Sequence, residues 1–224
     1  MLPSYEADRQ FVNRVKKSNL PEYPIEPKML EEINFPEFLM TTLPSIDGKS
    51  NKFLFYDSGA DDKPRSFIFT TSNNLNLLEN SHLFADGTFD IAPRLFLQTY
   101  TIHAIVNGRC LPLVYILLPG KSQALYSRVL DVISSMLKSP PKSLMLDFER
   151  AFINAAHIAF KNISIHGCFF HFKQAIWRKI QEIGLAKIYS ENSEIRKILK
   201  IAQVLDFIPP NDVKYQFNLL FFNL

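Results

Sequence analysis

The chain has 224 residues, of which 47% are hydrophobic and 21% are charged, and it contains 20 Phe and eight Tyr against seven Gly. This composition excludes a disordered chain and predicts one good-sized domain, or one domain with a smaller appendage, around a packed core. No apolar run approaches the roughly 18 residues that span a bilayer, the two cysteines cannot form a disulfide framework, and the net charge of +3 permits a phosphate-backbone partner without requiring one.

Proline interrupts residues 1–45, so we expect an extended arm there with a short helix at most. Two apolar runs, Phe53–Tyr56 and Ser66–Thr70, are separated by a polar loop and predict a hairpin. One or two turns of helix are expected over Ser72–Leu78, just ahead of the core.

Three β-rich runs follow, over Ser81–Phe89, Leu95–Val106 and Arg109–Leu118. The last two are joined by Asn107-Gly108, which is a strong hairpin signal. Three strands joined this tightly predict an antiparallel meander.

From Ser122 onwards, helices and strands are expected to alternate. Apolar residues recur at helical spacing after Ser122, the expected N-cap, until Pro140-Pro141. The later expected elements are a strand over Ser143–Phe148, a helix, a strand over Ile163–Phe170, a helix from near His171 to Gly184, and a helix over Ser193–Leu205. The order βββ-α-β-α-β-α predicts an α/β mixed sheet with helices on both faces and a C-terminal helical segment. It is the order of the ribonuclease H-like fold, although several α/β folds begin similarly.

Two aspartates lie where this fold would use them. Asp86 lies inside the first strand of the meander, a position that disfavours Asp and removes hydration from its carboxylate. Asp147 lies at the carboxyl end of the fourth strand, where open α/β sheets bind ligands. If these strands pair, the carboxylates converge and can share Mg²⁺ ions for phosphodiester chemistry.

Each aspartate also has a purely structural interpretation. Asp86-Gly87 is compatible with an ordinary turn, and Asp147 with a cap on the helix that begins at Glu149. The residues alone leave both interpretations open.

Several motifs follow one another between residues 65 and 190. They are Ala85-Asp-Gly-Thr-Phe-Asp-Ile-Ala-Pro93, Phe96-Leu-Gln-Thr-Tyr-Thr-Ile-His103, Tyr126, Leu146-Asp-Phe-Glu149 with Asn154-Ala155, and Gly167-Cys-Phe-Phe-His-Phe172 running into Gln174-Ala-Ile-Trp-Arg-Lys-Ile180. In this order they resemble the Mutator-like (MULE) transposase domain. We therefore divide the chain into an N-terminal arm and hairpin (residues 1–65), a ribonuclease H-like core (66–190) and the start of a helical insertion (191–224).

The resemblance implies a core with an Asp, Asp, Glu triad that binds Mg²⁺ or Mn²⁺ for DNA strand cleavage and transfer. Asp86 matches the first aspartate in its Asp-Gly-Thr-Phe setting, and Asp147 matches the second in its Asp-Phe-Glu setting. The implied partner is DNA at transposon ends, with self-association also allowed. The implied location is the nucleus of the cell, and we expect a soluble intracellular protein with no membrane partner.

The third acid of the family has no match in this sequence. The acids after the second aspartate's motif stand in other contexts: Glu182, Glu191, Glu194, Asp206 and Asp212. We therefore expect a truncated and impaired or inactive copy. The alternative is a domesticated or remnant domain that acts as a non-catalytic DNA- or protein-binding scaffold.

Cys168 and His171 match the family's Cys-x-x-His signature. Two ligands do not make a zinc site, so we expect this pair to tie the fifth strand to the third helix rather than to bind zinc. Lys173, Arg178 and Lys179 form a basic face that suits a DNA backbone, although a solvated, ion-paired surface explains them as well.

Overall fold

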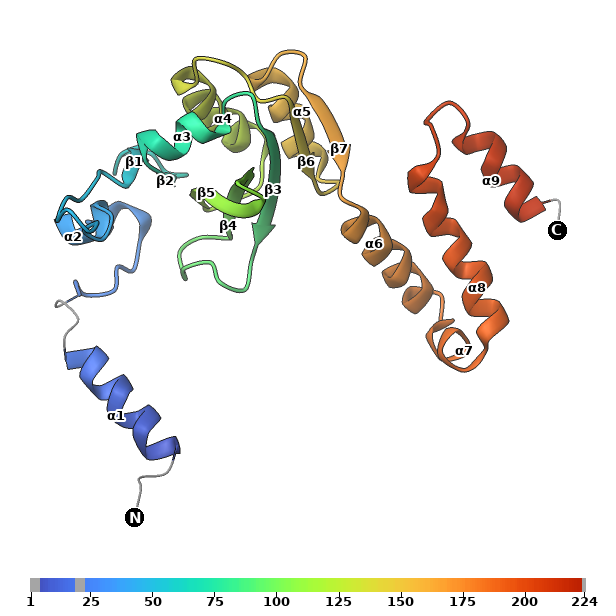
Figure 1. Ribbon diagram of the computed structural model, residues 1–224, viewed down its shortest axis with the longest axis horizontal. Coiled ribbons are helices and arrows are strands. Elements are labelled where there is room, and N and C mark those ends of the chain that lie inside the picture. The colour runs from blue at the N-terminus through green and yellow to red at the C-terminus, as the bar shows by residue number, and fades with distance from the viewer. Residues whose placement is uncertain (1–4, 19–22, 223–224) are drawn as a thin grey trace.

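The computed structural model describes residues 5–18 and 23–222. Within these ranges the strands form one seven-stranded sheet in the order β1-β2-β5-β4-β3-β6-β7 (Figure 1). The strands are β1 (Leu54–Asp57), β2 (Phe67–Phe69), β3 (His82–Thr88), β4 (Gln98–Val106), β5 (Arg109–Leu118), β6 (Ser143–Leu146) and β7 (Ser164–Gly167). The predicted mixed α/β sheet is thus confirmed.

The first five strands pair antiparallel to their neighbours in the sheet. Asn107 and Gly108 join β4 to β5 with φ of 50° and 74°, the two positive values that a type I′ hairpin turn requires. Pro112 pairs with His103 at a register shift between β4 and β5, a bulge position that tolerates the missing N–H of proline. The predicted meander and hairpin are both confirmed.

Strands β6 and β7 add to the other side of β3 in parallel. A parallel neighbour needs a crossover connection, and helix α5 (Arg150–Ala159) supplies it between β6 and β7. The first and fourth core strands, β3 and β6, are therefore adjacent.

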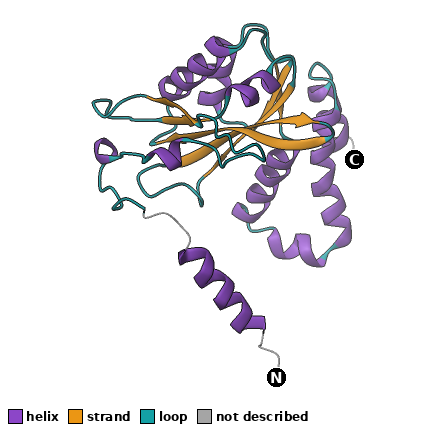
Figure 2. Cartoon of the chain, turned by 60° about the vertical axis from the view of Figure 1, so that its left-hand side comes forward, coloured by secondary structure: helices purple, strands orange, loops and turns teal. Residues whose placement is uncertain are grey.

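One face of the sheet carries α3 (Ser72–Leu78), α4 (Gln123–Met136) and α5 (Figure 2). Their apolar stripes follow the helical period and pack with alternate strand residues in the main hydrophobic core. As predicted, the Ser122 hydroxyl caps α4 by accepting a hydrogen bond from the Leu125 N–H. Thr71 caps α3 in the same way through the N–H of Asn74.

The opposite face is covered differently in its two halves. Over β2 and β5, a smaller core is formed by the segment that contains the short helices η1 (Leu30–Glu32, 3-10) and α2 (Glu37–Met40). The expectation of regular helices on both faces is wrong for this half, because a largely irregular segment covers it.

The expectation of a short helix at most in the arm is also wrong, because α1 (Tyr5–Ser18) has 14 residues.

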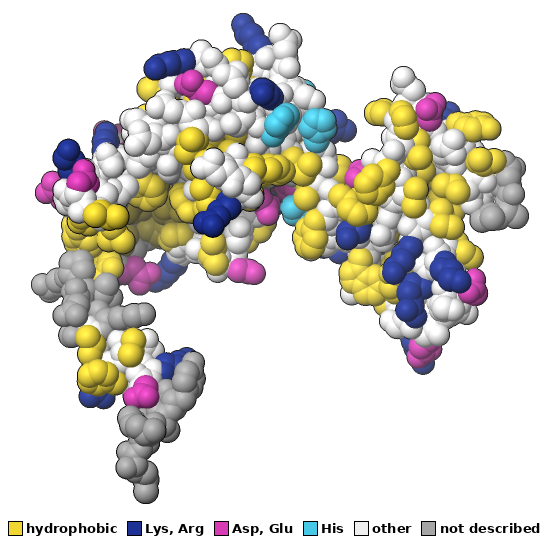
Figure 3. Space-filling model, in the orientation of Figure 1, with side chains coloured by type: hydrophobic (Ala, Val, Ile, Leu, Met, Phe, Trp, Pro, Cys, Tyr) yellow, Lys and Arg dark blue, Asp and Glu magenta, His cyan; other side chains and the backbone are white. Residues whose placement is uncertain are grey.

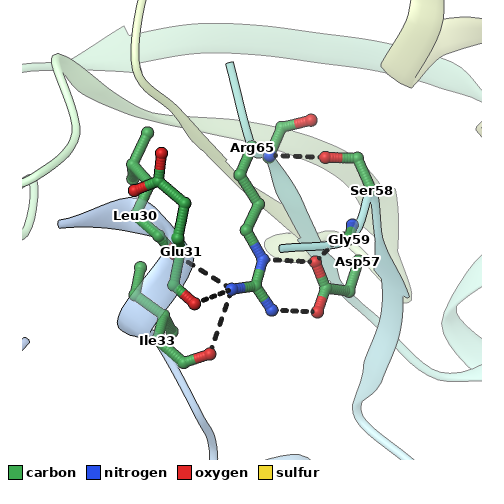
Figure 4. A network of polar contacts seen from close by, with 8 residues as sticks. Leu30, Glu31, Ile33, Asp57, Ser58, Gly59 and Arg65 are labelled. Carbon is green, nitrogen blue, oxygen red and sulfur yellow. Dashed lines mark hydrogen bonds and ion pairs between the residues drawn. The ribbon is translucent and has the colours of Figure 1, made fainter. Parts of the chain in front are cut away.

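Arg65 joins the N-terminal segment to the β1–β2 hairpin (Figure 4). Its guanidinium makes two hydrogen bonds to the Asp57 carboxylate, of 2.8 and 2.6 Å. The same guanidinium donates to the carbonyl oxygens of Leu30, Glu31 and Ile33 at the end of η1. The hairpin and the segment before it are therefore parts of one packed unit with the sheet, and β2 lies beyond the domain boundary expected at residue 65.

A helical arm leaves the sheet after β7 (Figure 1). It consists of α6 (Phe169–Glu182), α7 (Ala186–Glu191), α8 (Ser193–Ile201), the 3-10 helix η2 (Ala202–Phe207) and α9 (Val213–Phe222). Among the described helices of the whole chain, none has the length and apolarity that a membrane crossing needs.

Candidate active site

The register between β3 and β6, continued two residues beyond its last pair, would bring Asp86 level with Asp147, which follows β6. His82 pairs with Ser143, and Phe84 with Met145, at a sequence separation of 61. Asp86 and Asp147 have the same separation, one pleat further along. Because strand side chains alternate, Asp86 lies on the face opposite Leu83 and its neighbours in the main core. Strands β3 and β6 are thus neighbours, which is the condition that the predicted convergence of the two carboxylates required.

Asp86 belongs to a regular strand and not to a turn. Asp86 pairs with Thr101 and Gly87 with Tyr100 in the antiparallel ladder between β3 and β4. The side chain of Asp86 is 52% exposed. The loss of hydration expected from its place in a strand is therefore wrong, because this carboxylate is on an accessible surface of the sheet.

Asp147 immediately follows β6 and is half-buried. Its Oδ1 accepts a hydrogen bond of 3.1 Å from the backbone N–H of Glu149, the residue that precedes α5. This local turn resembles the predicted helix cap, and it also fixes the direction of the carboxylate. Both interpretations of Asp147 therefore rest on the same contact.

A buried hydrogen-bond chain lies behind Glu149. The amide Nε2 of Gln98 donates to the Tyr126 hydroxyl at 2.6 Å, and that hydroxyl donates to Glu149 Oε1 at 3.0 Å. Gln98 and Tyr126 are fully buried. Burial raises the pKa of the Glu149 carboxyl, while the hydrogen bond from Tyr126 opposes that rise. The chain thus connects β4 and α4 to the loop that holds Asp147.

Tyr100 lies at the centre of this region of the core. Its ring stacks on Phe152 with centroids 4.2 Å apart and meets Tyr126 edge-on. Burial raises the pKa of the Tyr100 hydroxyl well above its ordinary value, and the carboxylates of Asp147, Glu149 and Asp86 raise it further. The Tyr100 hydroxyl therefore stays protonated.

Gly87 has no room for a side chain. A Cβ built on Gly87 would lie 2.6 Å from Gln98 Oε1 and 3.1 Å from the Tyr100 ring. The residue next to Asp86 must therefore be glycine for Gln98 and Tyr100 to keep their positions.

The Cys-x-x-His segment lies beside Asp86. Cys168 precedes α6, and its N–H donates to the Leu146 carbonyl at 2.8 Å, which continues the pairing of β6 with β7. His171 then places its Nε2 3.8 Å from Asp86 Oδ1. The segment links the end of the sheet to the first turn of α6, next to the candidate site.

The three basic residues predicted to contact DNA have different surroundings. The Lys173 ammonium lies 4.9 Å above the Phe169 ring, and Arg178 is exposed. Lys179 is engaged with Glu182 at 2.8 Å in an i, i+3 pair, as the solvated-surface interpretation expects. These residues therefore do not form one uniform basic face.

The acids of the arm lie on other elements than the two aspartates: Glu182, Glu191, Glu194, Asp206 and Asp212. Among residues 5–18 and 23–222, no three His, Cys, Asp or Glu side chains come together as a ready-made metal cage. The sequence analysis missed Gln98 and the bond between Tyr126 and Glu149. Their one signal was that all three fall within motifs that carried the family resemblance.

Comparison with known families places this site in context. Residues 82–175 match the family model described as the MULE transposase domain. No curated protein matches the chain. The matched region runs from the first residue of β3 into α6, and so includes both aspartates and the Cys-x-x-His segment. The match supports a MULE transposase domain over these residues.

Proposed function

We propose that this domain is the ribonuclease H-like catalytic core of a DNA transposase and acts in phosphodiester cleavage and strand transfer. The observation that carries the proposal is the parallel pairing of β3, which contains Asp86, with β6, which Asp147 directly follows. The order β5-β4-β3-β6-β7, antiparallel on one side of β3 and parallel on the other, supports the fold assignment.

The donor set suits a hard divalent cation. Asp86 in β3 and Asp147 just after the adjacent strand β6 offer carboxylate oxygens, and Mg²⁺ and Mn²⁺ prefer oxygen ligands. Such ions, when bound, supply charge stabilisation for the attacking and leaving oxygens of a phosphoryl displacement. The protein's part is to hold Asp147 by the Glu149 N–H and to leave Asp86 accessible to the DNA.

Binding of Mn²⁺ tests the proposal directly. We expect Asp86→Asn and Asp147→Asn each to weaken Mn²⁺ binding by more than about tenfold, because each removes a charged ligand from a site of few ligands. Electron paramagnetic resonance of free Mn²⁺ measures this on the chain as it is. Asp131→Asn, an exposed aspartate of α4, is the matched control and should bind Mn²⁺ normally. Equal Mn²⁺ affinity in all four proteins would contradict the metal site.

DNA nicking is the second readout. Because the third acid has no match, we expect only slow Mn²⁺-dependent conversion of supercoiled plasmid to the open circle, abolished in Asp86→Asn and Asp147→Asn and retained in Asp131→Asn. Nicking that persists in both site variants would contradict catalysis by these aspartates. Plasmid binding without nicking, at saturating Mn²⁺, would instead favour a non-catalytic scaffold.

A further inference from the structure

The helical arm contains a groove that the site described above does not use. It has a volume of about 510 Å³ and lies between α6 and the elements α7, α8 and η2. Ligand pockets of about 300–1,000 Å³ are typical of proteins. The wall formed by α6 consists of Phe170, Lys173, Gln174 and Trp177. We call this cavity the arm groove.

The α6 wall is one continuous face of the helix. Its members occur at i, i+3, i+4 and i+7, which places them next to one another along a single stripe. Arg178 and Lys179 do not line the groove. Helical spacing therefore places Lys173 in the wall of the groove and leaves Arg178 and Lys179 outside it.

The opposite wall supplies complementary groups. Tyr189, Lys200 and Gln203 come from α7, α8 and η2. The rings of Trp177 and Tyr189 are 5.0 Å apart. The groove therefore offers flat aromatic rings, ammonium groups on both walls and side-chain amides, and its lining within the described chain includes no acidic residue. The space-filling view shows Lys and Arg next to hydrophobic side chains on the arm (Figure 3).

The Tyr189 wall is held in place by Arg196. The guanidinium donates to the backbone oxygens of Tyr189 and Ser190 at 2.9 and 2.6 Å, and it lies 6.0 Å from the centroid of the Tyr189 ring. These bonds fix the end of α7 against α8. The wall of the groove that carries Tyr189 is thus held in a defined position.

The groove begins where the candidate active site ends. His171, 3.8 Å from Asp86, lies on the first turn of α6, between groove residues Phe170 and Lys173. The candidate site and the groove thus meet at the first turn of α6, where His171 and the groove residues lie on neighbouring sides of the helix.

We infer that the arm groove binds unpaired nucleotides of the DNA strand that is processed at Asp86 and Asp147. Bases stack on the aromatic rings, phosphates pair with Lys173 and Lys200, and the amides of Gln174 and Gln203 contact base edges. The inference rests on the proposed function for the identity of the strand. A duplex is the weaker candidate because its base faces are already covered by stacking, whereas every unpaired base presents a π-face.

Trp177 makes the inference measurable, because it is the single tryptophan of the chain. We expect a 12-nucleotide oligothymidylate, added in EDTA at low salt, to quench its fluorescence by stacking. An abasic strand of equal length tests whether a base is needed, and it should bind through phosphates with little quenching. A blunt duplex of the same length should also leave the fluorescence largely unchanged.

Variants locate the binding. Tyr189→Leu and Lys200→Gln should each weaken oligothymidylate binding, measured by anisotropy of a labelled strand, by about tenfold. Trp177→Leu should have an effect of similar size, and Lys179→Gln, a cation of α6 outside the groove, should change binding less than twofold. Circular dichroism confirms that each variant is folded. The inference is overturned if the abasic strand or the duplex quenches as well as the oligothymidylate, or if Lys179→Gln weakens binding as much as Lys200→Gln.

The outcome is independent of the metal site. Asp86→Asn should bind oligothymidylate normally in EDTA, because no groove residue is changed. Loss of groove binding with Mn²⁺ binding intact would overturn this inference alone. Groove binding with Mn²⁺ affinity unaffected by the aspartate variants would instead overturn the proposed function.

Discussion

The sheet with its helices and the helical arm differ in how they are held together. Alternate strand residues and the stripes of α3, α4 and α5 are buried in one continuous core. In the described part of the arm, Ile180 is the buried hydrophobic residue, while Phe170, Ile183, Phe207 and other large apolar side chains are exposed. The sheet is therefore stabilised from within, whereas the arm is stabilised mainly by local helix contacts.

This difference divides the proposed tasks. Asp86 and Asp147 belong to the rigid unit, which suits a site that must hold its geometry. The arm groove belongs to the less densely packed unit. Contacts near the first turn of α6, such as His171 with Asp86 and Phe172 with Phe148, join the two. The rigid unit thus positions the carboxylates, and the arm presents a surface beside them.

The largest test of this contrast is Phe152→Ala. Phe152 is fully buried between Tyr100 and Tyr126, so its truncation should lower the free energy of unfolding by about 3–5 kcal/mol. Ile198→Ala in α8, which is 45% exposed, should cost less than about 1 kcal/mol. Urea denaturation followed by circular dichroism measures both. Similar losses would show that the arm is packed as firmly as the sheet.

Arg65→Leu extends the test to the edge of the rigid unit. It leaves Asp57 and three carbonyl oxygens without their donor, so we expect a loss of about 3 kcal/mol. Arg65 also lowers the pKa of Asp57 below 3.8. A carboxyl whose pKa is lowered by folding stabilises the fold at pH values above its pKa in the unfolded state. This stabilisation is lost as the pH falls through its pKa in the folded state.

The pH dependence separates this ion pair from simple packing. Arg65→Leu should therefore lower the free energy of unfolding more at pH 6 than at pH 3. Urea denaturation of the variant and the wild type at both pH values measures this difference. An equal cost at both values would mean that Arg65 acts through its carbonyl contacts alone.

Two glycines give the smallest and most local contrast. Gly87→Ala forces its new methyl against buried Gln98 and Tyr100 and should cost about 2 kcal/mol. Gly167→Ala meets the ring of Phe148 at 2.8 Å, but that side chain is 51% exposed and can rotate away, so we expect less than about 1 kcal/mol. Thermal melting of the two variants measures which substitution lowers stability more. A larger loss for Gly167→Ala would mean that the arm junction is the more tightly packed place.

Local signals predicted most of the central fold. Asn107-Gly108 required positive φ, Ser122 offered a hydroxyl to an uncapped helix, and apolar spacing set the helices. The pairing of β3 with β6, on which the convergence of Asp86 with Asp147 was made conditional, is present in the sheet. These features depend on neighbours in sequence or on topological rules, and both can be read without coordinates.

Long-range contacts escaped prediction. Arg65 binds carbonyls more than 30 residues away, and Gln98 reaches Tyr126 across 28 residues, distances at which the sequence carries no local periodic signal. The proximity of His171 to Asp86 was missed for the same reason. The prolines of the first 45 residues led to the expectation of an extended arm. None of these prolines falls between Tyr5 and Ser18, so helix α1 can form there and was missed.

The constant separation of 61 between β3 and β6 also constrains how the chain can change in length. An extra residue inserted between Phe84 and Asp86 would turn the aspartate toward the helix-covered face, because each step along a strand reverses the side chain. The same insertion at the Asn107-Gly108 turn only lengthens a surface loop and leaves the orientation of Asp86 intact. Length variation among descendants of this gene should therefore collect in the turns and spare the first few residues of β3.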